Sequence, residues 1–415
     1  MTSLNQLGSR AKTAARFLAT CSTKEKNSAL QHIADTLRTE TDIILAANQK
    51  DINSATKNGL TDAMIDRLRL TFKSIQVMAH DIETIISLPD PIGTMDHVWK
   101  NEDDLTIGKQ RVPLGVIGII YESRPNVTTD ASSLCFKAGN AIILRGGKEA
   151  FHSNQVLVKL MQQALSQCHI PQEAIQLLQD TSRETAREFM QLSDYLDVLI
   201  PRGGSNLIKT VVNTATVPVI ETGTGNCHVY VDQDAQIDMA VSIVVNGKCQ
   251  RPSVCNATET VIVHEAIATT FLPKLEAALA PFNVELRSDS QGMSWLTDSI
   301  LATDDDYATE FLDYILAVKI VSSVDEAIEH IHTYSTQHSE VIVTDNYFTS
   351  QIFTQQVDAA AVYVNASSRF TDGSAFGFGG EIGISTQKLH ARGPMGLNEL
   401  TSSKYIILGS GQIRQ

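Results

Sequence analysis

A cysteine close to cationic residues is the strongest chemical signal in this 415-residue chain. Cys255 stands in the stretch QRPSVCN (250–256), after a helical pattern and before the apolar run 261–263. A lone cysteine is often a buried, inert thiol. Here Lys248 and Arg251 are near in sequence, and cations stabilise the thiolate that attacks a carbonyl. We therefore predict that Cys255 is a nucleophile that carries an acyl group.

The other cysteines give no sign of a metal site. They stand at positions 21, 135, 168, 227 and 249, with no CxxC and no Cys/His cluster at the spacing of metal ligands. A disulfide between Cys249 and Cys255 depends on their separation and is not favoured. The pattern indicates reduced thiols in a cytoplasmic protein without a metal.

Composition excludes several classes of protein. The chain has 33 basic and 47 acidic residues, a net charge of −14, which argues against a nucleic-acid or anionic-membrane surface. No apolar run approaches the roughly 20 residues that span a bilayer. The first 24 residues are basic without an acid, which resembles a transit peptide, but their apolar spacing favours a first packed helix. We expect a soluble protein that binds small molecules.

Two pairs of glycines mark places where a phosphate could bind. The dinucleotide fingerprint GxGxxG and a complete P-loop are absent. Gly146-Gly147 follows the apolar run 141–144 after Arg145, and Gly203-Gly204 follows the run 198–200 after Pro201 and Arg202. At the carboxyl end of a strand and before a helix, backbone N–H groups and the helix dipole favour a phosphate, although a plain turn has the same composition.

The elements that position these residues alternate along the chain. Residues 3–88 read as helical, with Thr61 as an N-cap and one apolar face that continues to Pro89. The segments 94–112 and 397–413 stand outside the later alternation and could pair as an antiparallel arm. Strands are predicted at 116–121, 141–144, 198–200, 217–220, 228–231, 260–263, 318–321, 341–343 and 361–364, with helices near 128–138, 153–167, 183–193, 204–213 and 234–247. This alternation indicates an α/β fold with a parallel sheet covered on both faces.

Several long motifs together resemble the aldehyde dehydrogenase superfamily. They are the strand 115–120, the run YESRPNV (121–127), the two Gly-Gly turns, the late cysteine in RPSVCN (251–256), the segment 369–373, the run STQKLHARGPMGL (385–397) and the closing GQIR (411–414). The likeness covers essentially the whole chain. Its details resemble the branch that reduces L-glutamyl 5-phosphate with NADPH to glutamate 5-semialdehyde and phosphate, the second step of proline biosynthesis.

The resemblance implies an aldehyde-dehydrogenase-like α/β architecture of three parts. A Rossmann-like cofactor domain would comprise residues 1–93 and 113–229, and a catalytic α/β domain residues 230–390. A small oligomerisation arm would comprise 94–112 and 391–415 and would make a homo-oligomer. Glutamate kinase, which makes the acyl phosphate, is a possible transient partner.

The resemblance also assigns roles to residues. Cys255 is the nucleophile, and the side chain of Asn126 helps to hold the oxyanion. Arg145 and Lys148 meet the adenosine ribose and suit the 2′-phosphate of NADPH. Gly203, Gly204 and Ser205 lie beside the pyrophosphate, and Glu310 meets the nicotinamide ribose, although a solvated helix charge is an alternative for Glu310.

The charges of the substrate need partners. Arg369 and Arg392 are candidates for its carboxylate, and Arg124 or Arg251 for its phosphate, because a guanidinium binds both bidentately. Glu221 aligns with the glutamate that activates water in aldehyde-oxidising relatives, but the Gly-Gly that follows it there is absent, so a structural or proton-carrying role is expected.

Two other functions fit parts of the sequence. A hydrolytic aldehyde dehydrogenase would oxidise a small aldehyde to a free acid through Glu221. A scaffold protein would keep the fold without the reaction, but it would have no need of Cys255, Asn126, Arg145 and Lys148. Phosphate dependence of aldehyde oxidation separates the reductase from the hydrolytic enzyme.

Overall fold

The computed structural model describes residues 3–414, which form two compact units. The first comprises residues up to Thr222, Gly377–Gly383 and those from Met395 onward, and the second comprises Gly223–Phe376 and Ile384–Pro394. The predicted boundary at 229/230 is wrong, because it cuts through strand β7 (Cys227–Val231), which pairs with strands of the second unit. Residues 391–394, predicted as part of the arm, also belong to the second unit.

The first unit begins with the predicted helical region. Its helices are α1 (Leu4–Leu18), α2 (Thr23–Thr39), α3 (Thr41–Lys57), α4 (Asp62–Leu68) and α5 (Phe72–Ser87). Thr61 is the N-cap of α4, as predicted, and its side chain accepts the N–H of Met64. The apolar pattern does not form one helix from there to Pro89, however. Thr71 forms a capping box with Ser74, which starts a new helix.

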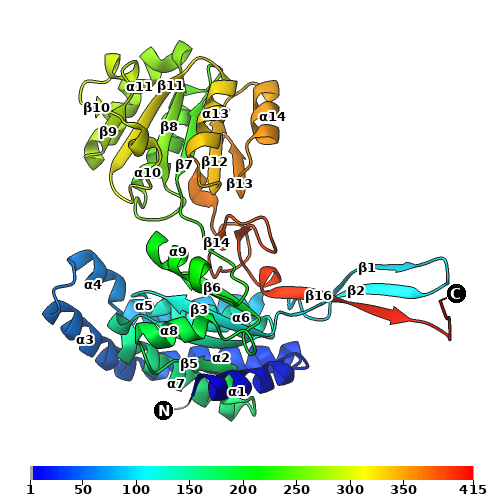
Figure 1. Ribbon diagram of the computed structural model, residues 1–415. Helices are drawn as coiled ribbons and strands as arrows, with labels where there is room; N and C mark the ends of the chain where they lie inside the picture. The colour runs from blue at the N-terminus through cyan, green and yellow to red at the C-terminus, as the bar shows by residue number, and fades with distance from the viewer. Residues whose placement is uncertain (1–2, 415) are drawn as a thin grey trace. The chain divides into compact units, whose positions relative to one another are not determined.

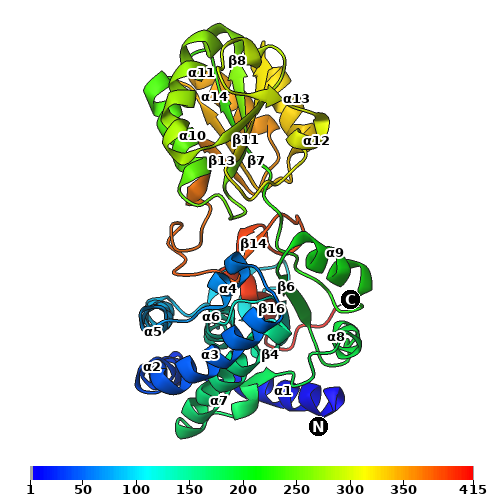
Figure 2. The ribbon, with the colours of Figure 1, turned by 90° about the vertical axis from the view of Figure 1, so that its left-hand side faces the viewer.

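A four-stranded parallel sheet lies at the centre of the first unit, in the order β5-β4-β3-β6. Its helices lie on both sides of it (Figures 1 and 2). The strands are β3 (Val116–Tyr121), β4 (Ala141–Gly146), β5 (Ile175–Leu177) and β6 (Val198–Arg202), and the helices between and after them are α6 (Asn126–Lys137), α7 (Phe151–Gln167), α8 (Arg183–Met190) and α9 (Ser205–Thr214). The strand predicted at 217–220 is wrong: it makes a single bridge to Leu199, because Pro218 has no N–H to donate.

The predicted antiparallel arm is confirmed. Strand β2 (Thr106–Pro113) pairs with β1 (Met95–Lys100) and with β16 (Thr401–Leu408), and these three strands extend away from the helices of the first unit (Figure 1). Large apolar side chains are exposed on the arm, among them those of Val98, Trp99, Tyr405, Ile407 and Leu408.

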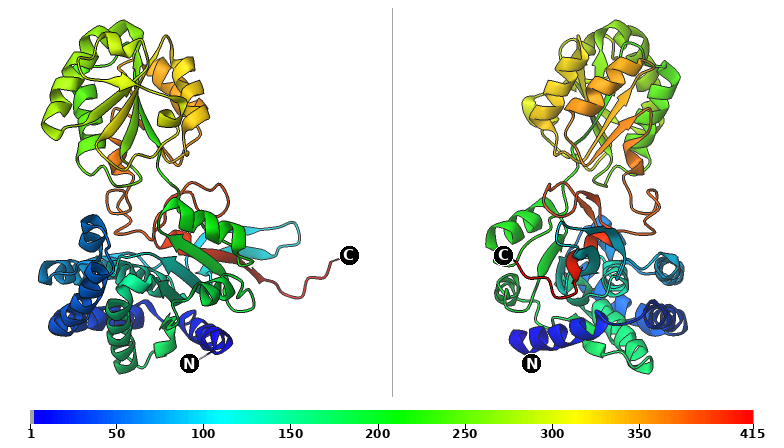
Figure 3. Two further views of the ribbon diagram at one scale, coloured as in Figure 1. Left: turned by 60° about the vertical axis from the view of Figure 1, so that its left-hand side comes forward. Right: turned by 90° about the vertical axis from the view of Figure 1, so that its right-hand side faces the viewer.

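The second unit contains a seven-stranded parallel sheet in the order β10-β9-β11-β8-β7-β12-β13. Besides β7, its strands are β8 (Thr258–His264), β9 (Glu285–Ser288), β10 (Ile300–Leu301), β11 (Ile315–Val321), β12 (Ser339–Val343) and β13 (Ala361–Val364), and its helices are α10 (Ile237–Cys249), α11 (Glu265–Leu279), α12 (Asp304–Tyr307), α13 (Val324–Tyr334) and α14 (Tyr347–Gln356). Helices cover both faces of this sheet (Figure 3).

The side chains of the central strands divide between two cores. Val229 and Val231 pack with α10 and α11, whereas Tyr230 packs with α13 and α14. Alternate residues of a strand point to opposite faces, so an uninterrupted apolar run is needed when both faces are covered. This is why the sequence signal for these strands is strong.

Shorter elements complete the description. They are β14 (Ile384–Ser385) with β15 (Gly393–Pro394), and the 3-10 turns η1 (Lys148–Ala150), η2 (Gln172–Ala174), η3 (Ala280–Phe282), η4 (Gly292–Ser294), η5 (Ser368–Phe370) and η6 (Asn398–Leu400). Within residues 3–414, no helix has the length and apolarity to cross a membrane. The same residues contain no group of three side chains placed to hold a metal ion, and none of their six cysteines forms a disulfide.

Candidate active site

One edge of the sheet in the first unit collects the predicted cofactor residues other than Glu310. Strand β3 lies between β4 and β6, and because all three are parallel their carboxyl ends meet at the same edge. Arg145 is near the end of β4 and Lys148 follows this strand, whereas Asn126 comes after β3 and Ser205 after β6. The structure thus brings these predicted residues to the place where open α/β sheets bind ligands.

The second glycine turn holds a carboxylate that the sequence analysis missed. Glu122, the residue after β3, accepts the N–H of Gly204 at 2.9 Å, just before the first turn of α9. A side chain at Gly203 would collide with this carboxylate, because an added Cβ would lie 2.6 Å from its Oε2. The backbone here favours an anion, as expected of a helix N-terminus.

Arg145 and Lys148 differ in their surroundings. Arg145 is half-buried, and its Nη2 donates to the carbonyl of Thr181 at 2.8 Å. Burial lowers its pKa, and Glu149 and Asp180 raise it less. Among the described residues its buried Nε has no hydrogen-bond partner. Lys148 is exposed at the start of η1.

Asn126 is the first residue of α6, and its amide has a fixed partner. The Nδ2 group donates to Oδ2 of Asp130, one helical turn later, at 3.0 Å. Burial, and then the charge of Asp81, raise the pKa of Asp130 to about 7, against smaller opposite effects of Asn126 and Arg202. The Asp130 carboxylate therefore orients the side-chain amide of Asn126, with its nitrogen toward Asp130. The second N–H of that nitrogen can donate to another ligand.

Cys255 lies in a turn at the amino end of a strand, in the sheet of the second unit. It is half-buried between α10 and β8, three residues before β8 begins, so the turn lies at the amino end of that strand. The turn closes through the N–H of Ala257, which donates to the carbonyl of Val254 at 3.0 Å. The rule that ligands bind at carboxyl ends would not have located this residue.

Two predicted arginines belong to the same unit as Cys255, and one of them, Arg369, interacts electrostatically with it. Burial lowers the pKa of Arg369; the nearby Arg251 lowers it further, and Asp372, Cys255 and Cys227 raise it. Arg369 is half-buried and donates from Nε to the side chain of Gln250 at 3.0 Å, and Arg251 is exposed.

The remaining predicted arginines lie elsewhere. Arg392 forms an ion pair with Asp358 at 2.7 Å, and Lys388 meets the same carboxylate. The buried Nε and Nη2 of Arg392 have no partner among the described residues. Arg124 is exposed in the first unit, before α6.

Glu310 is not the solvated helix charge that the sequence allowed. It lies three residues after α12 ends, is half-buried, and accepts the N–H of Gly225 at 2.8 Å. Burial raises the pKa of Glu310, and the Gly225 hydrogen bond lowers it less. Glu221 is half-buried outside any helix or strand of the first unit.

Comparisons with known proteins agree with the motifs. Residues 2–293 match the model of the Aldehyde dehydrogenase family. A gamma-glutamyl phosphate reductase of Enterococcus faecalis is 62% identical over 414 residues, which cover 100% of this chain and 99% of that protein. One from Listeria monocytogenes is 60% identical over 414 residues and 100% of both chains.

A solved structure is similar as well. The crystal structure of gamma-glutamyl phosphate reductase from Thermotoga maritima matches 100% of both chains with a TM-score of 0.98 and 47% identity. The resemblance seen in the motifs and the predicted α/β fold class are confirmed. The chain belongs to the aldehyde dehydrogenase family and, within it, to the gamma-glutamyl phosphate reductases.

Proposed function

We propose that this chain reduces L-glutamyl 5-phosphate with NADPH to L-glutamate 5-semialdehyde and phosphate, the second step of proline biosynthesis from glutamate. The observation that carries the proposal is the full-length identity of 62% to a protein of that name. The thiol of Cys255, which forms no disulfide and interacts electrostatically with Arg369, supports it.

The reaction divides into two steps at Cys255. Its thiolate attacks the acyl carbonyl carbon, a C–S bond forms, and the C–O bond to phosphate breaks with its electron pair leaving on phosphate. Bound NADPH supplies the hydride that takes the thioester to the aldehyde level. The C–S bond then breaks, which releases the aldehyde and restores the thiolate.

Asn126 is proposed to stabilise the oxyanion of both tetrahedral intermediates. Its amide keeps one N–H on Asp130 and has one more to donate, and the backbone N–H of Cys255 would be the second donor. Loss of one such donor typically lowers kcat by about 10²–10³.

The proposed cofactor contacts are those of the first unit together with Glu310. A dinucleotide fits the residues at the sheet edge in two respects: the N–H of Gly204 already holds a carboxylate, and the buried Nε of Arg145 has no partner among the described atoms. Arg145 and Lys148 would bind the 2′-phosphate, and Gly203, Gly204 and Ser205 the pyrophosphate. We expect Glu122 to leave Gly204 when the pyrophosphate binds, because two anions repel.

Arginines are proposed to bind the two ends of the substrate. Arg369 and Arg392 are the candidates for its carboxylate, and the free Nε and Nη2 of Arg392 favour this role. Arg251, which interacts with Arg369, and Arg124 are the candidates for the leaving phosphate.

The arm is proposed to hold a homo-oligomer together. Its exposed apolar side chains would be covered by a second copy, with strand pairing across subunits. Light scattering of the native chain should give a multiple of 45.3 kDa. A chain with Ile407→Lys should dissociate, whereas a monomeric native chain would refute this use of the arm. We also propose a transient contact with glutamate kinase, which supplies the acyl phosphate.

The test of the function is oxidation of glutamate 5-semialdehyde by NADP⁺ with and without phosphate. The reductase releases its acyl group only to phosphate, so turnover in the reverse direction should require phosphate. Equal turnover without phosphate would make Glu221 a water activator and the chain a hydrolytic aldehyde dehydrogenase.

A further inference from the structure

A second, buried cysteine contacts the backbone of Cys255. Cys227 is the first residue of β7 and fully buried, and its Sγ donates to the carbonyl oxygen of Cys255 at 3.3 Å. Burial raises its pKa well above the ordinary value, so it stays a protonated thiol and keeps its donor. A thiol of this kind is a poor nucleophile itself.

The chain just before Cys227 presses against the same carbonyl. An added Cβ at Gly225 would lie 1.3 Å from the carbonyl oxygen of Cys255, so only glycine allows this approach. The N–H of Gly225 is fixed by the carboxylate of Glu310. The carbonyl of Cys255 is thus held between a packed backbone and a thiol donor.

The residue after Cys255 is tied to the segment that carries Arg369. The Nδ2 of Asn256 donates to the carbonyl of Thr371 at 2.9 Å, and the hydroxyl of Ser368 donates to the carbonyl of Asn256 at 2.7 Å. All three side chains are buried. These two hydrogen bonds therefore join the nucleophile turn to the arginine segment 368–371.

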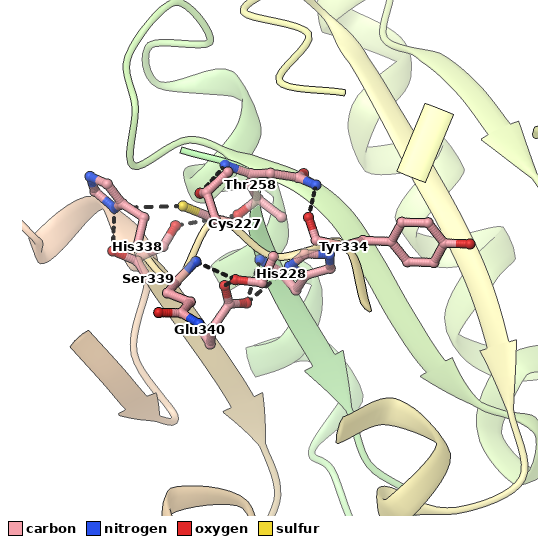
Figure 4. Close-up of polar contacts among 12 residues, drawn as sticks. Cys227, His228, Thr258, Tyr334, His338, Ser339 and Glu340 are labelled. Atoms are coloured by element: carbon pink, nitrogen blue, oxygen red, sulfur yellow. Dashed lines mark hydrogen bonds and ion pairs between the residues drawn. The ribbon is translucent and has the colours of Figure 1, made fainter. Parts of the chain in front are cut away.

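A chain of buried hydrogen bonds also links Cys227 to that segment. His338 Nδ1 lies 3.8 Å from the Cys227 thiol and 2.8 Å from the hydroxyl of Ser339 (Figure 4). Ser339 bonds to the hydroxyl of Thr371 at 2.7 Å. Burial lowers the pKa of His338 to about 4, so its ring is neutral at physiological pH.

We propose that Cys227 is a positioning residue for the reaction: its thiol fixes the carbonyl of Cys255 and, through His338, Ser339 and Thr371, fixes the nucleophile relative to Arg369. The inference rests on the proposed function, in which Cys255 attacks and Arg369 binds the substrate. A small displacement of a nucleophile lowers the rate of attack more than it weakens binding.

The experiment compares Cys227→Ala and Cys227→Ser with the control Cys249→Ala, which removes another buried thiol of the same unit. Loss of one hydrogen bond should lower kcat about three- to tenfold in Cys227→Ala and leave both KM values within about twofold. Cys227→Ser, which keeps a donor, should recover at least half of kcat, and Cys249→Ala should not change it. If Cys227→Ala does not fold, Cys227→Val fills the site without a cavity and without a donor and should show the same loss.

Unchanged kcat in Cys227→Ala, a Ser variant as slow as Ala, or an equal loss in Cys249→Ala would overturn the proposal. The pH profile of iodoacetamide alkylation at Cys255 gives a readout that needs no substrate. It should shift in Cys227→Ala, return in Cys227→Ser and stay unchanged in Cys249→Ala; an unmoved profile would also overturn it. Turnover that survives Cys255→Ala would instead refute the proposed function. The alkylation profile of chains that keep Cys255 would then still test the positioning role of Cys227.

Discussion

A buried ion pair should hold the segment that carries Glu310. Lys248 and Glu259 meet at 2.5 Å between Nζ and Oε2, and both side chains are fully buried. Glu259 also accepts the N–H of Leu312, a residue with a positive φ of 57°, and Lys248 donates to the carbonyl of Asp313 at 3.0 Å. The pair therefore fixes residues 312–313, next to Glu310.

The expected cost of breaking the pair follows from this burial. In Glu259→Leu, the ammonium of Lys248 keeps only the carbonyl of Asp313 and the ring face of Phe311. Removal of one partner from a buried pair costs about 3–5 kcal/mol, because the other charge is left without compensation. Lys248→Met should cost about the same. The double variant should cost less than about 2 kcal/mol, because no charge is left buried.

Urea denaturation followed by tryptophan fluorescence measures these differences. Trp295 packs against the core of the second unit, whereas Trp99 is exposed on the arm, so a Trp99→Phe background isolates the second unit. A single variant that costs under about 1 kcal/mol, or a double variant that equals the sum of the singles, would refute the reasoning.

Other predictions concern the first unit. Asn126→Ala should lower kcat of semialdehyde oxidation by about 10²–10³ with little change in KM, and an unchanged kcat would remove it from the oxyanion site. Lys148→Ala should raise KM for NADPH about tenfold and leave KM for NADH within about threefold, whereas equal effects would refute the contact with the 2′-phosphate. Asp130→Asn should stabilise the chain progressively as pH rises from about 4 to 7. Between the unfolded and folded pKa of Asp130 only the folded state keeps the proton. The free energy of unfolding of the native chain therefore falls by about 2–4 kcal/mol over that range, whereas Asp130→Asn has no proton to lose. Urea midpoints of native and variant chains that differ by a constant at every pH would contradict it.

Much of the fold follows from period and composition. Apolar runs such as 116–121 and 260–263 are strong signals because both faces of these strands are buried. The short strands β5, β9 and β10 escaped notice because two to four residues carry no period. The unit boundary was misplaced because β7 joins its sheet through β8 and β12, which come later in the chain.

The site was predictable to the extent that its residues follow strand ends or motifs. Arg145, Asn126 and Ser205 meet at one edge because β3, β4 and β6 are parallel neighbours. Glu122, Asp130 and Cys227, which contact residues of the proposed site, were missed, because a contact with a partner 4 to 82 residues away leaves no local pattern. The position of Glu122, directly after a buried strand, was the one sign in the sequence that this carboxylate could lie at the sheet edge.

The most direct test of the central claim is a search for the acyl group on Cys255. L-Glutamyl 5-phosphate can be made in place by glutamate kinase from glutamate and ATP, with NADP⁺ instead of NADPH so that no hydride is available. Mass spectrometry of the digested protein should then find a hydroxylamine-sensitive glutamyl adduct on the peptide that contains Cys255, and none in Cys255→Ala. An adduct on another residue, or no adduct while the enzyme turns over with NADPH, would contradict the account.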